Sequence, residues 1–148
     1  MATTYQSYQV AKGNTPRAVS PGVYSIYGEF ALSAALVVND VIQMVSVPNG
    51  ARVLNIMLNS DDLDTAGPAI VLDVGDGNDT NRFIDGALVA QAATANNVDM
   101  MDLTYGNTAG FGYKYTQNDT IDVLVETGPT TGATTGTIKL IALLAMDD

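Results

Sequence analysis

From residue 23 onward, apolar residues recur at every second position in a series of short runs. The clearest runs are Ile70, Leu72 and Val74, and later Ile121, Val123 and Val125. A period of two is that of a β-strand, whose side chains point alternately to opposite faces. Runs of this kind separated by Gly, Asn and Asp are typical of strands joined by tight turns. The chain is therefore predicted to be all-β, with little helix.

The number of these runs predicts the architecture. Eight or more short strands indicate one antiparallel β-sandwich over residues 23–148, because 148 residues is the size of a single domain. A jelly roll is the first expectation and an immunoglobulin-like sandwich is the second. Asn49-Gly50, between the apolar runs 40–47 and 52–60, predicts a β-hairpin. The other segments expected to form strands are 111–115, 137–146 and, together with a loop, the Ala-rich 87–95.

Two of the expected strands carry finer predictions. In 52–60, the inward-facing residues are expected to be Leu54, Ile56 and Leu58. The run 40–47 is apolar on both faces, as in a strand buried within a sandwich or at a subunit interface. Charged residues make up only 15% of the chain, which leaves little to cover apolar surface. Together these features predict a homotrimer.

Residues 1–22 differ from the rest in charge and pattern. Their side chains sum to +2, from Lys12 and Arg17, whereas residues 23–148 sum to −12, from four bases and sixteen acids. Their apolar residues are isolated, so the segment cannot fold alone. It is either a frayed terminus or an extended arm that orders against a neighbouring acidic subunit. In the second case Tyr5, Tyr8 and Val10 are the predicted anchors, beside the two basic residues.

The composition excludes several kinds of chemistry. The chain has no Cys and no His, which removes thiolate zinc sites, cysteine nucleophiles and Ser-His-Asp triads. An enzyme is therefore not expected, and no cofactor is implied. A net charge of −10 disfavours nucleic acid as a partner. The polar residues 1–10 do not resemble a secretory signal, and no apolar run spans a bilayer. Synthesis in a cytoplasm and no membrane association are expected.

The densest polar region consists of residues 60–64, which include Asp61, Asp62 and Asp64, followed by residues 73–79, in which Asp73, Asp76 and Asp79 alternate with Gly and Asn. Such a cluster could hold calcium, but it lacks the EF-hand spacing and occurs once. Turn formation is the favoured interpretation, because Asp and Asn cap turns. Asp73 and Asp76 could also be the paired carboxylates of a glycosidase. This hypothesis is weaker, because the chain has no Trp on which a sugar could stack. Arg82, between Asp79 and Asp85, is expected to form a local ion pair.

The stretch 48–86, PNGARVLNIMLNSDDLDTAGPAIVLDVGDGNDTNRFIDG, resembles small structural proteins of tailed bacteriophages that are encoded beside the major capsid protein. The G-A-R-V-L start, the S-D-D-L-D-T bend, the L-D-V-G-D-G turn and the R-F-I-D-G strand occur there in this order. The stretches 115–123 and 132–134 continue the resemblance, which covers about two thirds of the chain. Its motifs are turns and core strands, and none is catalytic.

The resemblance implies a capsid decoration (cement) protein with a jelly-roll fold, trimeric on the outside of the head. Its partner would be the major capsid protein of the same virion, whose neighbouring capsomers it would bridge. An acidic body suits the outside of a particle that contains DNA. Two alternatives remain open: a head or tail fibre module that binds a host glycan, and a small Asp-dependent glycosidase or lyase.

Overall fold

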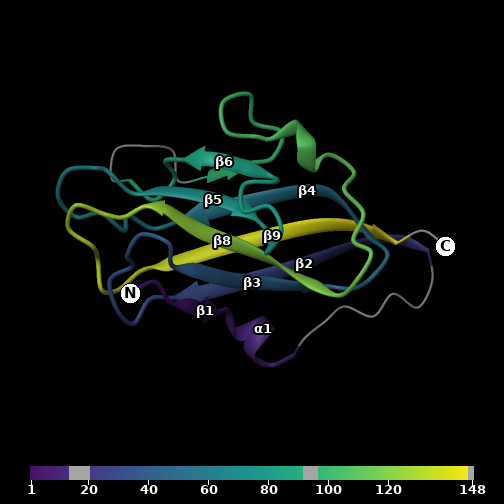
Figure 1. Cartoon of the computed structure of the whole chain (residues 1–148), viewed down its shortest axis with the longest axis horizontal. Coiled ribbons are helices and arrows are strands. Elements are labelled where there is room, and N and C mark those ends of the chain that lie inside the picture. Colours follow the sequence, from purple (N-terminus) through teal and green to yellow (C-terminus); the bar gives the residue numbers. More distant parts are fainter. Residues whose placement is uncertain (14–20, 92–96, 147–148) are drawn as a thin grey trace.

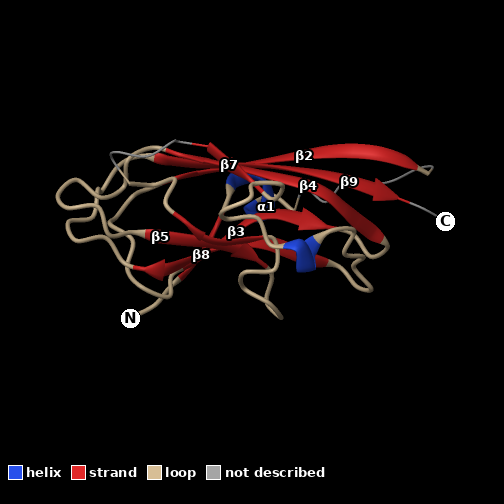
Figure 2. Ribbon diagram, turned by 90° about the horizontal axis from the view of Figure 1, so that it is seen from above, coloured by secondary structure: helices blue, strands red, loops and turns tan. Residues whose placement is uncertain are grey.

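The computed structural model describes residues 1–13, 21–91 and 97–146, which form two β-sheets packed face to face (Figures 1 and 2). In spatial order, the first sheet contains β1 (Thr4–Gln6), β3 (Val41–Val47), β8 (Asp119–Thr127), β5 (Val71–Gly75) and β6 (Ile84–Ala87). The second contains β2 (Gly22–Ala31), β9 (Thr137–Met146), β4 (Ala51–Ser60) and β7 (Asn97–Asp99). The helical elements are α1 (Tyr8–Ala11) and the 3₁₀ turn η1 (Thr108–Gly110). No helix in the described ranges is long and apolar enough to cross a bilayer.

The strand pairing is that of a jelly roll. From β2 and β9 inward along the sequence, each strand of the first half pairs antiparallel with one of the second half. The pairs are β2 with β9, β3 with β8, β4 with β7, and β5 with β6. The contacts of β4 with β9 and of β5 with β8 then join these pairs into two sheets. The all-β prediction and the preference for a jelly roll are confirmed.

The core lies between the sheets and follows the period of two. Ile70, Leu72 and Val74 are completely buried, and so are Ile121, Val123 and Val125. The strand expected at 137–146 is β9, with the same bounds. Alternation therefore identified the core residues wherever a strand is regular.

The predicted hairpin at Asn49-Gly50 is wrong. The turn is present, since Ala51 N donates to Pro48 O and Gly50 has a φ of +89°. However, β3 and β4 lie in different sheets, so the turn carries the chain across the sandwich. Asn-Gly specifies a local reversal, whereas the partners of the two strands are decided by β8 and β9, far away in sequence.

A β-bulge explains why β3 looked apolar on both faces. The register shifts between Gln43 and Val45, so that Met44 and Val45 are both completely buried. The shift moves the apolar residues after the bulge onto the same face as those before it. The apolar character of this strand is thus satisfied within one chain and does not require a subunit interface.

A second bulge corrects the inward set predicted for β4. The register shifts between Val53 and Asn55, which buries Val53 and leaves Leu54 41% exposed. The expectation for Leu54 was therefore wrong, whereas Ile56 and Leu58 are buried as predicted. An extra residue in a strand reverses the inside and outside positions on one side of it.

Two other expected strands differ from the structure. Residues 111–115 form no regular strand: they follow η1 and bond irregularly to the start of β4, with Tyr113 O accepting from Val53 N. In 87–95, β6 ends at Ala87 and Gln91 forms an isolated bridge with Asp64. Residues 92–95 lie outside the described residues.

Residues 1–13 pack on their own chain. β1 pairs with β3 in parallel, and the buried Ser7 donates its hydroxyl to Met44 O and caps α1 at Val10 N. The Tyr5 ring lies 5.4 Å from the Phe30 ring. This half of the segment is therefore ordered on its own chain, where β1 covers backbone groups at the edge of β3. Its role as an arm toward a partner stays a prediction. The division of the chain at residue 22 stays a prediction.

Candidate functional site

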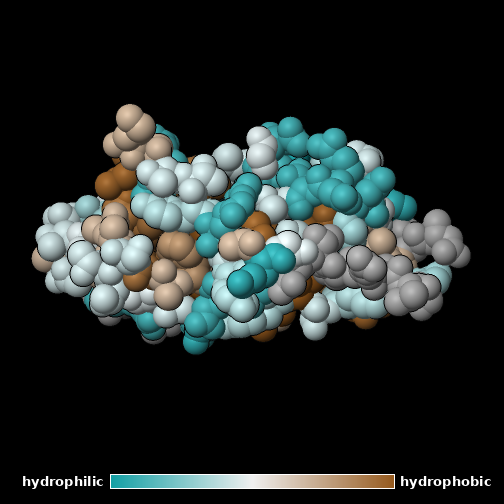
Figure 3. Space-filling model, turned by 90° about the horizontal axis from the view of Figure 1, so that it is seen from below, coloured by the Kyte–Doolittle hydropathy of each residue, from teal (hydrophilic) through white to brown (hydrophobic). Residues whose placement is uncertain are grey.

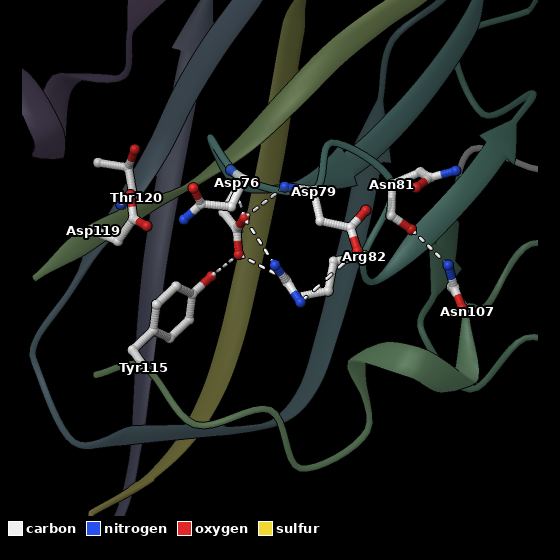
Figure 4. A network of polar contacts seen from close by, with 9 residues as sticks. Asp76, Asp79, Asn81, Arg82, Asn107, Tyr115, Asp119 and Thr120 are labelled. Carbon is white, nitrogen blue, oxygen red and sulfur yellow. Dashed lines mark hydrogen bonds and ion pairs between the residues drawn. The ribbon is translucent and has the colours of Figure 1, made fainter. Parts of the chain in front are cut away.

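Asp76 is the centre of a polar network that includes Arg82 and Tyr115 (Figure 4). Its Oδ2 lies 2.8 Å from Arg82 Nε and 3.2 Å from the Tyr115 hydroxyl. Its Oδ1 accepts from Asn78 N and Asp79 N, both at 3.0 Å, and from Arg82 Nη2 at 3.3 Å. Both carboxylate oxygens are thus occupied by the turn that follows β5, with Tyr115 joined from a distant loop. The interpretation as turn chemistry fits this geometry.

Arg82 is held on two sides. Besides Asp76, its Nη1 lies 3.8 Å from Asp79 Oδ2, and its guanidinium stacks 3.8 Å above the Tyr113 ring. Burial lowers the pKa of Arg82, but the hydrogen bond and charge of Asp76 outweigh it and raise the pKa overall. Burial, with the Asp76 charge, raises the pKa of the Tyr115 hydroxyl. These groups keep fixed protonation states, which suits a structural clamp.

The three calcium candidates do not converge. The Asp73 carboxylate accepts from Gly86 N at 2.8 Å, the Asp76 carboxylate is bonded to its own turn and to Arg82, and the Asp79 carboxylate lies 3.8 Å from Arg82 Nη1. In the described part of the chain, no group of three or more His, Cys, Asp or Glu residues could hold a metal ion. Calcium independence stays a prediction that only a binding measurement tests.

Asp64 belongs to the densest polar region of the sequence, but its role as a buried carboxylate that joins two loops was not predicted. It is 1% exposed and accepts from Ala69 N at 2.8 Å, Ile70 N at 3.2 Å, and Thr130 N and Thr131 N at 3.0 Å. Burial alone would raise its pKa, but the four donors outweigh burial and lower the pKa to about 2. Asp64 thereby joins two loops that are far apart in sequence. No local sequence motif predicts its contact with the second loop, which contains Thr130 and Thr131.

The five strands of the first sheet contain five acids and no base. Four of the acids form what we call the acidic face: Asp73, Asp85, Asp122 and Glu126. Burial raises the pKa of Asp73 to about 6, with help from the Glu126 and Asp85 charges and against the Gly86 N–H. Burial raises the pKa of Asp122 to about 7, aided by Asp119 and Asp76 and opposed by Thr120. Buried Oδ1 of Asp122 accepts no hydrogen bond from the described residues.

The outer face of the second sheet is different. Its exposed hydrophobic residues form what we call the apolar face: Val23, Tyr27, Leu54, Met57 and Ile141. Tyr27, Ile141 and Met57 lie side by side in register on β2, β9 and β4. They line a groove of about 410 Å³, with Asn59, Asn97, Asp99, Asp102 and Lys139 as its polar members. The four strands carry two acids and two bases, so this sheet is neutral.

The structure separates the predicted anchors of the N-terminal segment. Tyr5 is half-buried against Phe30, whereas Tyr8 is 65% exposed, with Lys12 Nζ 5.6 Å from its ring. Val10 is half-buried on α1, and Arg17 lies outside the described residues. Seen from below, hydrophobic residues show mainly toward the left end, with smaller patches elsewhere (Figure 3). Partner binding through these residues stays a prediction, for which Tyr8 and Lys12 have the accessible side chains.

No protein-family model matches this sequence, and no curated protein matches it. Solved structures do. A chain in the capsid of Ralstonia phage GP4 has a TM-score of 0.81 at 28% identity, over 98% of this chain and 99% of that one. A chain in the capsid asymmetric unit of cyanophage Pam1 has a TM-score of 0.75 at 28% identity, over 89% and 90%.

A more distant match is to a chain in the acid-stable capsid of Helicobacter pylori bacteriophage KHP30, with a TM-score of 0.57 at 16% identity, over 87% of this chain and 95% of that one. This match concerns the fold alone. The chain is thus similar, over nearly its whole length, to chains of phage capsids. The similarity supports a structural role in a virion.

Proposed function

We propose that this chain is a decoration protein: it binds the outside of a phage capsid as an oligomer and reinforces contacts between capsomers of the major capsid protein. The observation that carries the proposal is the end-to-end similarity to the chain in the Ralstonia phage GP4 capsid. Equal lengths and a shared jelly roll point to a similar place in the particle.

The carboxylates support a binding role over catalysis. A glycosidase needs one acid and one base or nucleophile at a fixed separation across a substrate cleft. Here the Asp76 carboxylate accepts from Asp79 N and from Arg82, and the Asp73 carboxylate accepts from Gly86 N, so both are engaged in contacts within the chain. Binding of a shell requires none of these groups to react.

Charge supports a position outside the shell. The chain carries −10, and five of its acids lie on the strands of one sheet without a compensating base. Packaged DNA would repel this surface, whereas the outside of the particle exposes it to solvent. A homotrimer remains our prediction, and it now rests on the small share of charged residues, because the bulge in β3 buries the apolar residues of that strand within one chain.

The test is to add the purified chain to capsids that lack it and to measure binding by co-sedimentation. We expect saturable binding, density on the outer surface in cryo-electron microscopy, and slower rupture of the particles on heating. A chain that does not sediment with capsids, or that instead binds host glycan, would contradict the proposal.

A further inference from the structure

We infer that the apolar face is the surface through which two copies of this chain associate. The inference rests on the proposed function only for the existence of an oligomer, and it adds which residues form the contact. It does not depend on attachment to a capsid. The face lies on the outer side of the layer formed by β2, β9, β4 and β7 (Figure 2).

Three neighbouring hydrophobic side chains of the apolar face are exposed to solvent. Tyr27, Ile141 and Met57 are 41%, 37% and 37% exposed, and they lie next to one another across three strands. Single exposed hydrophobic residues are ordinary, but a contiguous row beside a groove is typical of an interaction site. The groove of about 410 Å³ gives the face a concave part that a side chain of a partner can enter.

The charge of the apolar face favours a second copy of this chain over a basic partner. A second copy has the same net charge of −10, so it is repelled wherever acids are exposed. The strands of the second sheet are the exception, because Glu29 and Asp99 are balanced by Arg52 and Lys139, and Asp102 beside the groove adds one negative charge. Two copies can therefore approach through this sheet at a lower electrostatic cost than through the acidic face. A basic partner would instead be attracted to the acidic face.

The area of the apolar face is sufficient for a specific interface. β2, β4 and β9 each contain ten residues. At standard strand rise and spacing, three such strands cover roughly 500 Å². A contact between this face and a surface of equal size buries roughly 1,000 Å² in total, which is about the minimum for a specific interface. The groove residues at the edge of β7 add to this area.

The experiment compares two charge-matched variants of the isolated full chain. Ile141→Lys places a cation in the centre of the apolar face, and Leu124→Lys places one on the outer side of β8 in the opposite sheet. Both raise the net charge by the same amount. Molar mass is measured by light scattering and sedimentation across the micromolar range, and folding is checked by circular dichroism.

We expect the unmodified chain and Leu124→Lys to have a mass that is a multiple of 15.5 kDa, with at least a tenfold weaker association for Ile141→Lys. Val23→Lys is the second variant on the same face, at a side chain that is 65% exposed and thus safe for folding. It should weaken association in the same direction.

Four outcomes would overturn the inference. Three concern association alone: an unmodified chain that is monomeric throughout, an oligomer that both face variants leave intact, and equal weakening by Leu124→Lys. The fourth is an intact oligomer of Ile141→Lys that no longer binds capsids, which would show that the face contacts the shell. A monomeric chain would also contradict the oligomer in the proposed function, but capsid binding is measured separately, and its failure leaves this inference untouched.

Discussion

Asp64 and Asp122 are two carboxylates that the fold takes out of water with opposite consequences. Asp64 accepts four backbone N–H groups, and its pKa falls to about 2. Asp122 has a buried oxygen to which none of the described residues donates a hydrogen bond, and burial raises its pKa to about 7. Burial disfavours the charged form of both carboxylates. The number of hydrogen-bond donors that each accepts from therefore decides whether its pKa falls or rises. Loop ends have free N–H groups to offer, whereas the N–H groups of a sheet are already used in its ladder.

The largest effect is expected at Asp64. Asp64→Ala leaves four backbone donors of two loops without their acceptor and should lower the melting temperature by roughly 10 °C at pH 7. Asp64→Asn keeps one acceptor oxygen and should therefore lower the melting temperature by less than Asp64→Ala does. Thermal unfolding followed by circular dichroism measures both. Asp62→Ala, at an exposed neighbour that accepts one N–H, that of Asp64, should lower the melting temperature less. An equal loss would contradict the role given to the Asp64 carboxylate.

A change at Asp122 should act in the opposite direction. The folded chain binds protons on Asp122 and Asp73 up to pH values near their raised pKa values, while the unfolded chain releases them near the ordinary pKa of 3.8. Stability should therefore fall as the pH rises from about 4 to about 8. Asp122→Asn removes the charge and should stabilise the chain by about 2 kcal/mol at pH 8 and by little at pH 5.

Chemical denaturation at the two pH values measures this prediction. The matched control is Glu126→Gln, an exposed acid on the same strand, which should change the free energy of unfolding by less than about 0.5 kcal/mol. Asp64 contributes in the reverse sense, because its pKa is lowered, and its contribution is lost as the pH falls below 3.8 toward 2. A stability that rises steadily from pH 4 to pH 8 would contradict the assignment of Asp122.

The smallest expected effect is that of calcium. Since both oxygens of Asp76 are already occupied, millimolar calcium should change the melting temperature by less than about 1 °C. Differential scanning calorimetry with and without chelator measures it. A large stabilisation that Asp76→Asn abolishes would show that this turn is a metal site.

The core strands and turns were predictable because their causes are local. The alternation of Ile121, Val123 and Val125 requires one buried face, and the Gly and Asp residues near 75 require a turn. The bulges in β3 and β4 were not predictable, since a bulge depends on the partner strand that the extra residue faces. Each bulge reversed the inside and outside positions beyond it, which misplaced Leu54 and made β3 seem apolar on both faces.

By itself, the sequence determined an all-β sandwich, its core residues and the absence of thiol and imidazole chemistry. These follow from residue type and from a period of two. Only the tertiary structure decided that residues 1–13 pack on their own chain, that Asn49-Gly50 crosses between sheets, and that one outer face is acidic while the other is neutral and apolar. The physical reason is that strand pairing joins segments distant in sequence, and a side chain's environment depends on which segment lies beside it.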